Sequence, residues 1–304
     1  MRLPPGDALA LRPGLARPPL VEPEELSAGA LGEGTRVLEL SLTREGARFA
    51  DGHLPGASWV YWKDLLWCAR LRCLRDPADM ARALDRALPP AGGPLVLYAE
   101  RIQFAVYAYW TLAAIGGRDG VSVLNGGATA WAAAGYRLEA GERAGLDVEP
   151  SQAVPADRSS ARYQAHVATR DDVRAVVDGR VPGVLVDLRS EGEYLGSAAD
   201  QLALLEVCRG GHIEGAISLP HLRLVDAHGA LRPVEECREE VLRALGLTAP
   251  DREVICYCRS GHRSALGWLV LEGLMGISGV RVYMGSWLEW ANLVDAPIVP
   301  GDPV

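Results

Sequence analysis

The chain has 304 residues, which is enough for two domains of ordinary size that each bury their own core. Its 31 basic and 39 acidic residues give a net charge of −8, which argues against a nucleic-acid-binding protein, because such domains are usually strongly basic. With 49% hydrophobic and 23% charged residues, the composition is that of a folded chain and excludes a disordered, collagen-like or coiled-coil protein.

Neither a membrane span nor a signal peptide is expected. The longest apolar run, from Phe104 to Gly117, is shorter than the roughly 18 residues that a spanning helix needs. The first residues, Met1 to Gly6, carry a charge and prolines where a signal peptide has an apolar segment. Six cysteines are too few for a disulfide scaffold in a chain of this length, so we expect reduced cysteines and a cytoplasmic location.

The sequence repeats itself once. A shift of 159 positions maps His53-Leu-Pro-Gly-Ala onto His212-Ile-Glu-Gly-Ala, Tyr98 onto Tyr257 and Trp131 onto Trp290. Nearer the start of each copy the shift is only 148, so the second copy carries about eleven extra residues (159 − 148) between its first strand and its His-Ile-Glu-Gly turn. The period is too long for a solenoid and indicates a duplicated domain. We expect domains at 1–150 and 160–304, with a linker near 141–165.

Each copy alternates apolar, β-branched runs with helical patterns. In chain order, the second copy has predicted helices over 170–180, 234–246, 262–275 and 286–293, and predicted strands at Val184–Asp187, Glu253–Tyr257 and Gly279–Tyr283. This alternation predicts an α/β fold in which each domain is a mainly parallel sheet with helices on both faces. Ligands bind such sheets beyond the carboxyl ends of the strands, which directs attention to the loop after Tyr257.

That loop reads Cys258-Arg259-Ser260-Gly261-His262-Arg263-Ser264 and leads into a helical run. A cysteine here faces backbone N–H groups and the positive end of a helix, both of which favour the thiolate. Arg259 and Arg263 add positive charge, and Gly261 lets the backbone curl without a Cβ clash. We therefore expect Cys258 to be a nucleophile in an anion-binding loop formed by Arg259, Ser260, Gly261, His262 and Arg263.

The remaining cysteines read as small buried apolar residues: Cys68, Cys73, Cys208, Cys237 and Cys256. Cys256 and Cys258 have no second Cys/His pair at ligand spacing, so no metal site is expected. The spacing Cys258-x4-Arg263 is one residue shorter than the Cys-x5-Arg of cysteine phosphatases. A shorter loop closes more tightly around the sulfur, which suits a persulfide better than a phosphate.

Several of these segments resemble tandem-domain rhodaneses, the thiosulfate and mercaptopyruvate sulfurtransferases. The resemblance covers most of the chain and rests on Leu185-Val-Asp-Leu-Arg-Ser190 with Glu193-Tyr-Leu-Gly196, on Gly211-His-Ile-Glu-Gly-Ala216, and on Val282-Tyr-Met-Gly-Ser-Trp-Leu-Glu-Trp290. It implies two rhodanese-like domains, of which the first is catalytically silent, since Ala99 falls where Cys258 falls. In the family an arginine near Arg189 faces the substrate.

The resemblance implies a sulfurtransferase that needs no cofactor and no metal. Its expected partners are a small-molecule donor such as thiosulfate and a thiophilic acceptor such as cyanide or a thiol, and we expect a monomer without nucleic-acid or membrane partners. Arg259 favours thiosulfate, but Ser260 and Glu193 stand where many thiosulfate enzymes have basic residues, and Glu193 would repel a dianion if it faced the cleft. The alternatives are a mercaptopyruvate sulfurtransferase, a cysteine-based phosphatase or arsenate reductase, and a non-catalytic binding module.

Overall fold

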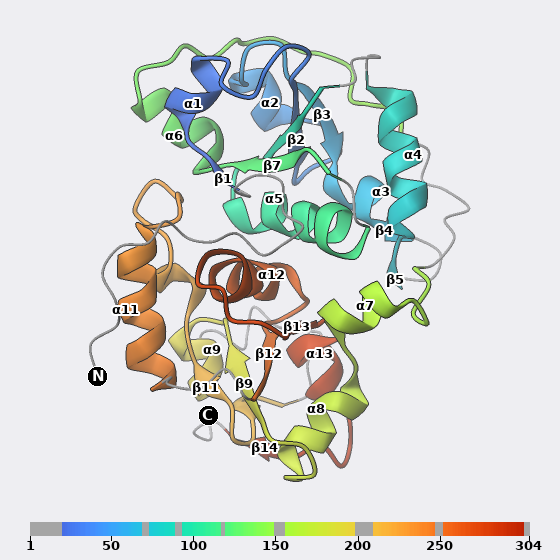
Figure 1. The fold of residues 1–304 in the computed structure, drawn as a ribbon, viewed down its shortest axis with the longest axis vertical. Helices are drawn as coiled ribbons and strands as arrows, with labels where there is room; N and C mark the ends of the chain where they lie inside the picture. The colour runs from blue at the N-terminus through green and yellow to red at the C-terminus, as the bar shows by residue number, and fades with distance from the viewer. Residues whose placement is uncertain are drawn as a thin grey trace. The chain divides into compact units, whose positions relative to one another are not determined.

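The computed structural model describes residues 20–68, 73–88, 93–116, 119–148, 156–197, 209–246 and 252–300 (Figure 1). The chain forms two compact units. The N-terminal unit comprises the described parts of Pro19–Val167 together with Val225–Arg232, and the C-terminal unit comprises the described parts of Ala168–Leu224 and Pro233–Val304. The units therefore divide just beyond the linker expected at 141–165, and a short segment of the second half folds with the first.

The N-terminal unit is built on a five-stranded sheet of order β1-β7-β6-β2-β3 whose neighbouring strands are all parallel. The strands are β1 (Leu20–Val21), β2 (Arg36–Ser41), β3 (Ser58–Tyr61), β6 (Leu95–Tyr98) and β7 (Val121–Leu124), and a small hairpin joins β4 (Trp67–Cys68) to β5 (Cys73–Leu74). The helices are α1 (Pro23–Ser27), α2 (Ala47–Asp51), α3 (Trp62–Leu66), α4 (Pro77–Ala87), α5 (Ile102–Tyr109), the π-helix η1 (Trp110–Ile115), α6 (Gly127–Ala133) and α7 (Ala161–His166).

The C-terminal sheet has the order β11-β9-β12-β13-β8, which is the N-terminal order read from the other edge. Its strands are β8 (Val167–Ala168), β9 (Gly183–Asp187), β11 (Ile217–Ser218), β12 (Glu253–Tyr257) and β13 (Val280–Tyr283), and β10 (His212–Ile213) pairs antiparallel with β14 (Ile298–Val299). The helices are α8 (Arg170–Val177), α9 (Glu191–Leu195), η2 (His221–Arg223), α11 (Val234–Leu245), α12 (His262–Trp268), the π-helix η3 (Leu269–Leu274) and α13 (Ser286–Trp290).

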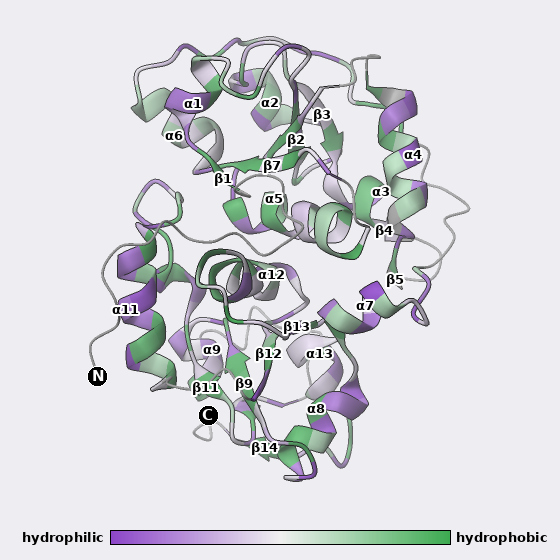
Figure 2. Ribbon diagram, viewed as in Figure 1, coloured by the Kyte–Doolittle hydropathy of each residue, from purple (hydrophilic) through white to green (hydrophobic). Residues whose placement is uncertain are grey.

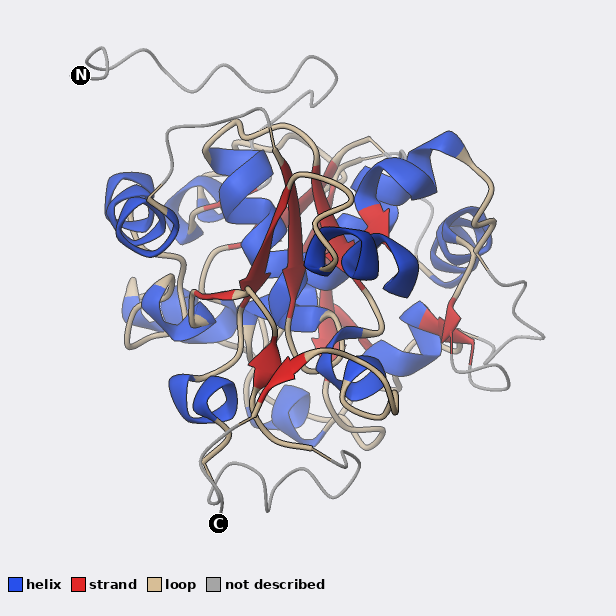
Figure 3. Ribbon diagram, turned by 90° about the horizontal axis from the view of Figure 1, so that it is seen from below, coloured by secondary structure: helices blue, strands red, loops and turns tan. Residues whose placement is uncertain are grey.

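Helices pack on the strands of each unit, as the alternating sequence pattern predicts (Figure 3). Successive strand residues point to opposite faces of a sheet. In β12, Ile255 and Tyr257 join a core with Val173 of α8 and Trp287 of α13, whereas α12 packs on β12 and β13. Figure 2 shows hydrophobic and hydrophilic residues side by side along α11, whereas α5 and α12 are buried along most of their length. The expected α/β architecture of two similar domains is confirmed.

The repeated histidine turns have the same structural role in both units. His53 Nδ1 bonds to the carbonyl of Phe49 (2.8 Å) and His212 Nδ1 to that of Tyr194 (2.9 Å), and in each pair the two rings stack. Four residues separate the partners in the first unit and eighteen in the second, so the extra residues of the second copy fall between α9 and His212. Cys208 is among residues 198–208, which lie outside the described part of the chain.

Among the described residues, no helix is long and apolar enough to cross a membrane.

Candidate active site

The loop after β12 is positioned by the neighbouring strand β9. The two strands are parallel, with Tyr257 opposite Asp187, so the segments that follow them leave the sheet at the same edge. The N–H of Leu188 donates to the carbonyl of Tyr257 (2.9 Å), which ties the two exits together. The structure thereby places Cys258 beside the segment that carries Arg189 and Glu193, residues about 70 positions away in sequence.

Cys258 lies at the base of a tight turn. Its side chain is buried, and the N–H of Gly261 donates to Cys258 Sγ at 3.2 Å. Gly261 adopts φ +100°, in the region that side chains rarely occupy, and a Cβ there would come within 3.4 Å of Met284 Sδ. The helix α12 starts at the next residue, so this turn aims backbone amides at the sulfur in the way that the sequence predicts.

The environment of Cys258 favours the thiolate. Burial by itself raises the pKa of the thiol, but the charge of Arg263, the hydroxyl of Ser264 and the backbone N–H groups of Ser260 and Ser264 outweigh it, and the net effect is a lowered pKa. Cys256 differs, because burial and its negative neighbours raise the pKa of its thiol far above the ordinary value. The surroundings thus favour the thiolate at Cys258 and the protonated thiol at Cys256.

Ser286 holds the backbone of Cys258 from the adjacent strand exit. The N–H of Cys258 donates to Ser286 Oγ (3.3 Å), and that hydroxyl donates to the carbonyl of Tyr283 (2.7 Å). Ser286 has φ +51° and is the one non-glycine residue with positive φ in the described part of the chain. Sequence reasoning missed this residue, although the first copy has Gly127 at the matching position, also with positive φ.

Arg263 and Glu193 form a two-point ion pair. Arg263 Nη1 lies 2.6 Å from Glu193 Oε2 and Nη2 lies 2.9 Å from Oε1, and both side chains are largely buried. Although burial opposes ionisation of Glu193, its hydrogen bonds and the charge of Arg263 lower the pKa of the carboxyl to about 2. We expect Glu193 to repel a dianion if it faces the cleft. In the structure its negative charge is paired with the guanidinium of Arg263, a predicted substrate-binding residue, which thereby has two of its N–H groups occupied.

Asp187 and Arg189 form a second buried pair. Arg189 Nε and Nη2 both bond to the Asp187 carboxylate, at 3.0 and 2.6 Å, and Nη2 also donates to the carbonyl of Gly211 (2.8 Å). The guanidinium lies over the ring of Trp287, 4.4 Å from its centroid, and is fully buried. These contacts hold Nε and Nη2, while Nη1 has no hydrogen-bond partner among the residues that the structure describes, and substrate binding by Arg189 stays a prediction.

The other loop residues line the same turn and are each half-buried. Ser260 Oγ lies 3.5 Å from His262 Nδ1, and the carbonyl of Arg259 accepts from the N–H of Leu288 (3.0 Å). Five of the six predicted substrate-binding residues, Arg259 to Arg263, thus lie in the loop that begins at Cys258. The sixth, Arg189, is fully buried in its ion pair with Asp187.

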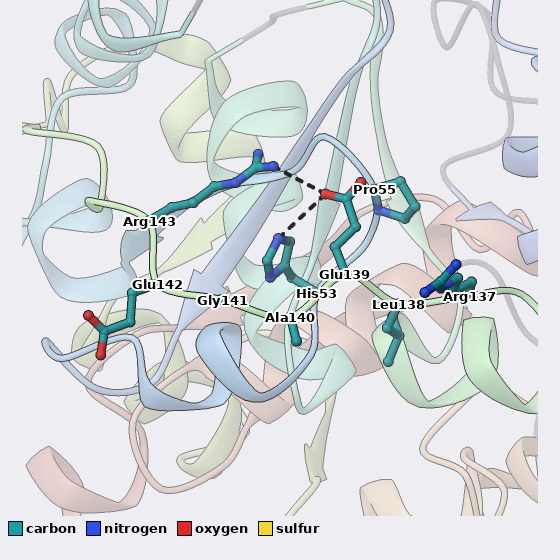
Figure 4. A pocket seen from close by; sticks show the side chains of 9 residues that line it. All are labelled: His53, Pro55, Arg137, Leu138, Glu139, Ala140, Gly141, Glu142 and Arg143. Atoms are coloured by element: carbon teal, nitrogen blue, oxygen red, sulfur yellow. Dashed lines mark hydrogen bonds and ion pairs between the residues drawn. The ribbon is translucent and has the colours of Figure 1, made fainter.

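A cavity of about 700 Å³ lies elsewhere, in the N-terminal unit, at the His53 turn and the segment 137–143 (Figure 4). There Glu139 lies between His53 (3.7 Å) and Arg143 (3.1 Å). None of its lining residues is a cysteine, serine or threonine. Because the His53 turn precedes β3, the cavity adjoins the amino end of that strand of the N-terminal unit. The cysteine loop, by contrast, follows the carboxyl end of β12 in the C-terminal unit. None of its lining residues comes from the Cys258 loop.

The architecture is thus that of a duplicated parallel α/β domain with a buried thiol of lowered pKa in the second copy. The family of the Rhodanese-like domain matches the chain twice, over residues 25–134 and 169–293. The chain belongs to the rhodanese family and carries two rhodanese-like domains, as its motifs predict.

Curated relatives match along nearly their whole length. The sulfur carrier protein TtuD of Thermus thermophilus is 32% identical over 279 residues, which cover 89% of this chain and 93% of that protein. The thiosulfate sulfurtransferase of Corynebacterium glutamicum is 31% identical over 294 residues, covering 93% of this chain and 91% of that protein. The solved structure of the anaerobic ergothioneine biosynthesis enzyme of Chlorobium limicola has a TM-score of 0.72 at 23% identity over 94% of this chain and 70% of that chain, so it shares the fold.

Proposed function

We propose that this rhodanese is a sulfurtransferase that moves sulfane sulfur from thiosulfate or a related donor to a thiophilic acceptor through a persulfide on Cys258. The observation that carries the proposal is a buried thiol with a lowered pKa and a backbone N–H 3.2 Å from its sulfur. The names of the two curated relatives, a sulfur carrier and a thiosulfate sulfurtransferase, point the same way.

The reaction has two displacements at sulfur. The Cys258 thiolate attacks the outer sulfur of thiosulfate, the S–S bond of the donor breaks, and sulfite leaves with the bonding electron pair. Cyanide or a thiolate then attacks the outer sulfur of the Cys258 persulfide, so that thiocyanate or a new persulfide departs and the Cys258 thiolate is restored. Atoms, charge and electrons balance without any further reactant.

The loop supplies the charge stabilisation that both steps need. The amides held by the Gly261 turn would hold the anionic outer sulfur, as an oxyanion hole holds developing charge. Arg259, Ser260 and His262 stand where the donor and its leaving group would bind, and the charge of Arg263 lowers the pKa of the Cys258 thiol. Mercaptopyruvate is the alternative donor, and breakage of its C–S bond would leave pyruvate.

The test is thiocyanate formation from thiosulfate and cyanide. Replacement of Cys258 by serine is expected to lower turnover at least about a thousandfold, the scale seen when a nucleophile is removed. Cys237→Ser is the matched control, because Cys237 is also buried but lies on α11, outside the loop. Intact mass should show an adduct heavier by one sulfur atom in the wild type and in the control only.

A wild-type protein without turnover, or a Cys258→Ser variant that keeps it, would refute this function. Substituting mercaptopyruvate for thiosulfate and following pyruvate tests the alternative donor. The lowered thiol pKa adds a pH criterion: the rate of alkylation of Cys258 by iodoacetamide should reach its half-maximum below the pH at which a free cysteine does.

A further inference from the structure

Two of the three arginines that the structure brings near Cys258 are paired with carboxylates, and the third is the half-buried Arg259 of the loop. Arg189 is bound by Asp187, and Arg263 is bound at two points by Glu193. The four side chains have no net charge in sum, so together with the Cys258 thiolate this buried cluster carries one negative charge. Arg263 is the cation that most favours that thiolate, and Glu193 is the group that offsets its charge.

This balance bears on which donors can approach. Attack of a thiolate on an anionic donor is opposed by like-charge repulsion, which grows with the donor charge and is weakly screened inside a protein. A surplus of cations would offset that repulsion for a doubly charged donor. In this cluster the surplus is removed by Glu193, which is held rigidly: it is the third residue of α9, and its Oε2 also accepts from the N–H of Ser190 (2.9 Å).

We propose that Glu193 determines donor specificity by neutralising Arg263, so that the site takes singly charged sulfane-sulfur donors in preference to the thiosulfate dianion. This inference rests on the proposed function and names its donor class. The probe is methanethiosulfonate, CH₃–SO₂–S⁻, which differs from thiosulfate by a methyl group in place of one charged oxygen. The Cys258 thiolate attacks its outer sulfur, the S–S bond breaks, and methanesulfinate leaves with the electron pair, giving the same persulfide.

The experiment compares kcat/KM for methanethiosulfonate and thiosulfate, with cyanide as the acceptor, at constant ionic strength. Each value is divided by the rate at which a free thiol reacts with the same donor, which removes the intrinsic reactivity of the two compounds. On this scale the wild type should favour methanethiosulfonate. Glu193→Gln should shift the ratio towards thiosulfate by about tenfold or more, because it removes a negative charge beside the site and keeps one acceptor for Arg263.

Two further variants separate charge from structure. Glu191→Gln removes the same charge from the same helix at an exposed position that contacts Arg223 (3.5 Å), and it should change the ratio less than about twofold, as expected for a screened surface charge. Glu193→Asp keeps the charge, so it should keep the wild-type ratio even if turnover falls, and it carries the test if the glutamine variant does not fold.

The outcomes distinguish this inference from the function on which it rests. If the wild type favours thiosulfate on the corrected scale, or if Glu193→Gln changes both donors by the same factor, Glu193 does not select by charge and the inference is wrong while sulfur transfer stands. A shifted ratio in Glu193→Asp would contradict it equally. If neither donor yields thiocyanate, the proposed function itself fails.

Discussion

The two domains share a frame but differ in the turn that follows the central strand. In both, a buried tyrosine ends that strand, and its hydroxyl accepts from a backbone N–H of the histidine turn, at 3.3 Å for Tyr98 and for Tyr257. After Tyr98 the helix α5 starts at Ile102, the position that matches Gly261, and its cap residue Arg101 is in extended conformation. The two domains therefore share this frame, whereas the second has a thiol and a glycine turn at positions where the first has Ala99 and Ile102.

The buried carboxylates beneath these tyrosines differ too. Asp187 is paired with Arg189, whereas the first copy has Glu39 with Ser41 at the arginine position. Without that cation, burial raises the pKa of Glu39, although its hydrogen bond with Tyr98 partly opposes the shift. The first domain thus buries a carboxyl group with a raised pKa where the second domain buries an ion pair. The following variants test how far each difference matters.

The largest effect is expected from Gly261→Ala, which moves the Cys258 turn towards its counterpart in the first domain. The positive φ opposes a Cβ, so the amide should leave the sulfur and kcat/KM should fall by about a hundredfold, the scale for loss of one oxyanion-hole donor. Gly215→Ala is the control: it has φ +76° and no atom within 4 Å, so it should lower stability similarly without affecting turnover. Equal turnover in both variants would show that the turn is dispensable.

A smaller effect is expected from Ser286→Gly, which copies Gly127 of the first domain. Loss of the hydroxyl removes the partner of the Cys258 N–H and should lower kcat by about threefold to tenfold, as for one ordinary hydrogen bond. Ser286→Ala loses the same hydroxyl but keeps the strained backbone, so its unfolding free energy should be about 1 kcal/mol below that of the glycine variant. Full activity in Ser286→Gly would reduce this residue to a structural role.

The smallest effect concerns Glu39 and pH. Because the folded-state pKa of Glu39 is raised, its stability contribution is present below the ordinary carboxyl pKa and is lost as the pH rises through the raised value. Glu39→Gln should remove that loss, so the difference in melting temperature between variant and wild type should grow in favour of the variant as the pH rises. The exposed Glu45→Gln serves as the control, and a pH-independent difference for Glu39→Gln would refute the raised pKa.

Local features of this protein could be predicted from the sequence. The strands Gly183–Asp187 and Glu253–Tyr257 are apolar runs bounded by polar segments, and the helix after Gly261 follows a turn that only glycine forms easily. Because the carboxyl ends of parallel strands form ligand sites, these runs also located the Cys258 loop.

Pairing between distant side chains was harder to predict. In the sequence Glu193 and Arg263 are two separate charges 70 positions apart, and neither residue alone indicates that their side chains form a two-point ion pair. Knowledge that β9 and β12 are neighbouring strands would have predicted that Glu193 and Arg263 lie close together, because both residues follow the carboxyl ends of these strands by a few positions. Arg189 was placed near the substrate by resemblance, and its burial depends on Trp287 and Asp187, which come from two different segments.

The short segment Val225–Arg232 has a consequence for how the protein is made. Asn125, at the end of β7, accepts from the N–H of Leu231 (2.7 Å) with its side-chain oxygen, so a buried polar group of the N-terminal unit is satisfied by a residue over a hundred positions later. Domains generally fold in the order in which they leave the ribosome. Here the first unit cannot complete its hydrogen bonds until much of the second half has been synthesised, and a truncation after the linker would leave Asn125 without this partner.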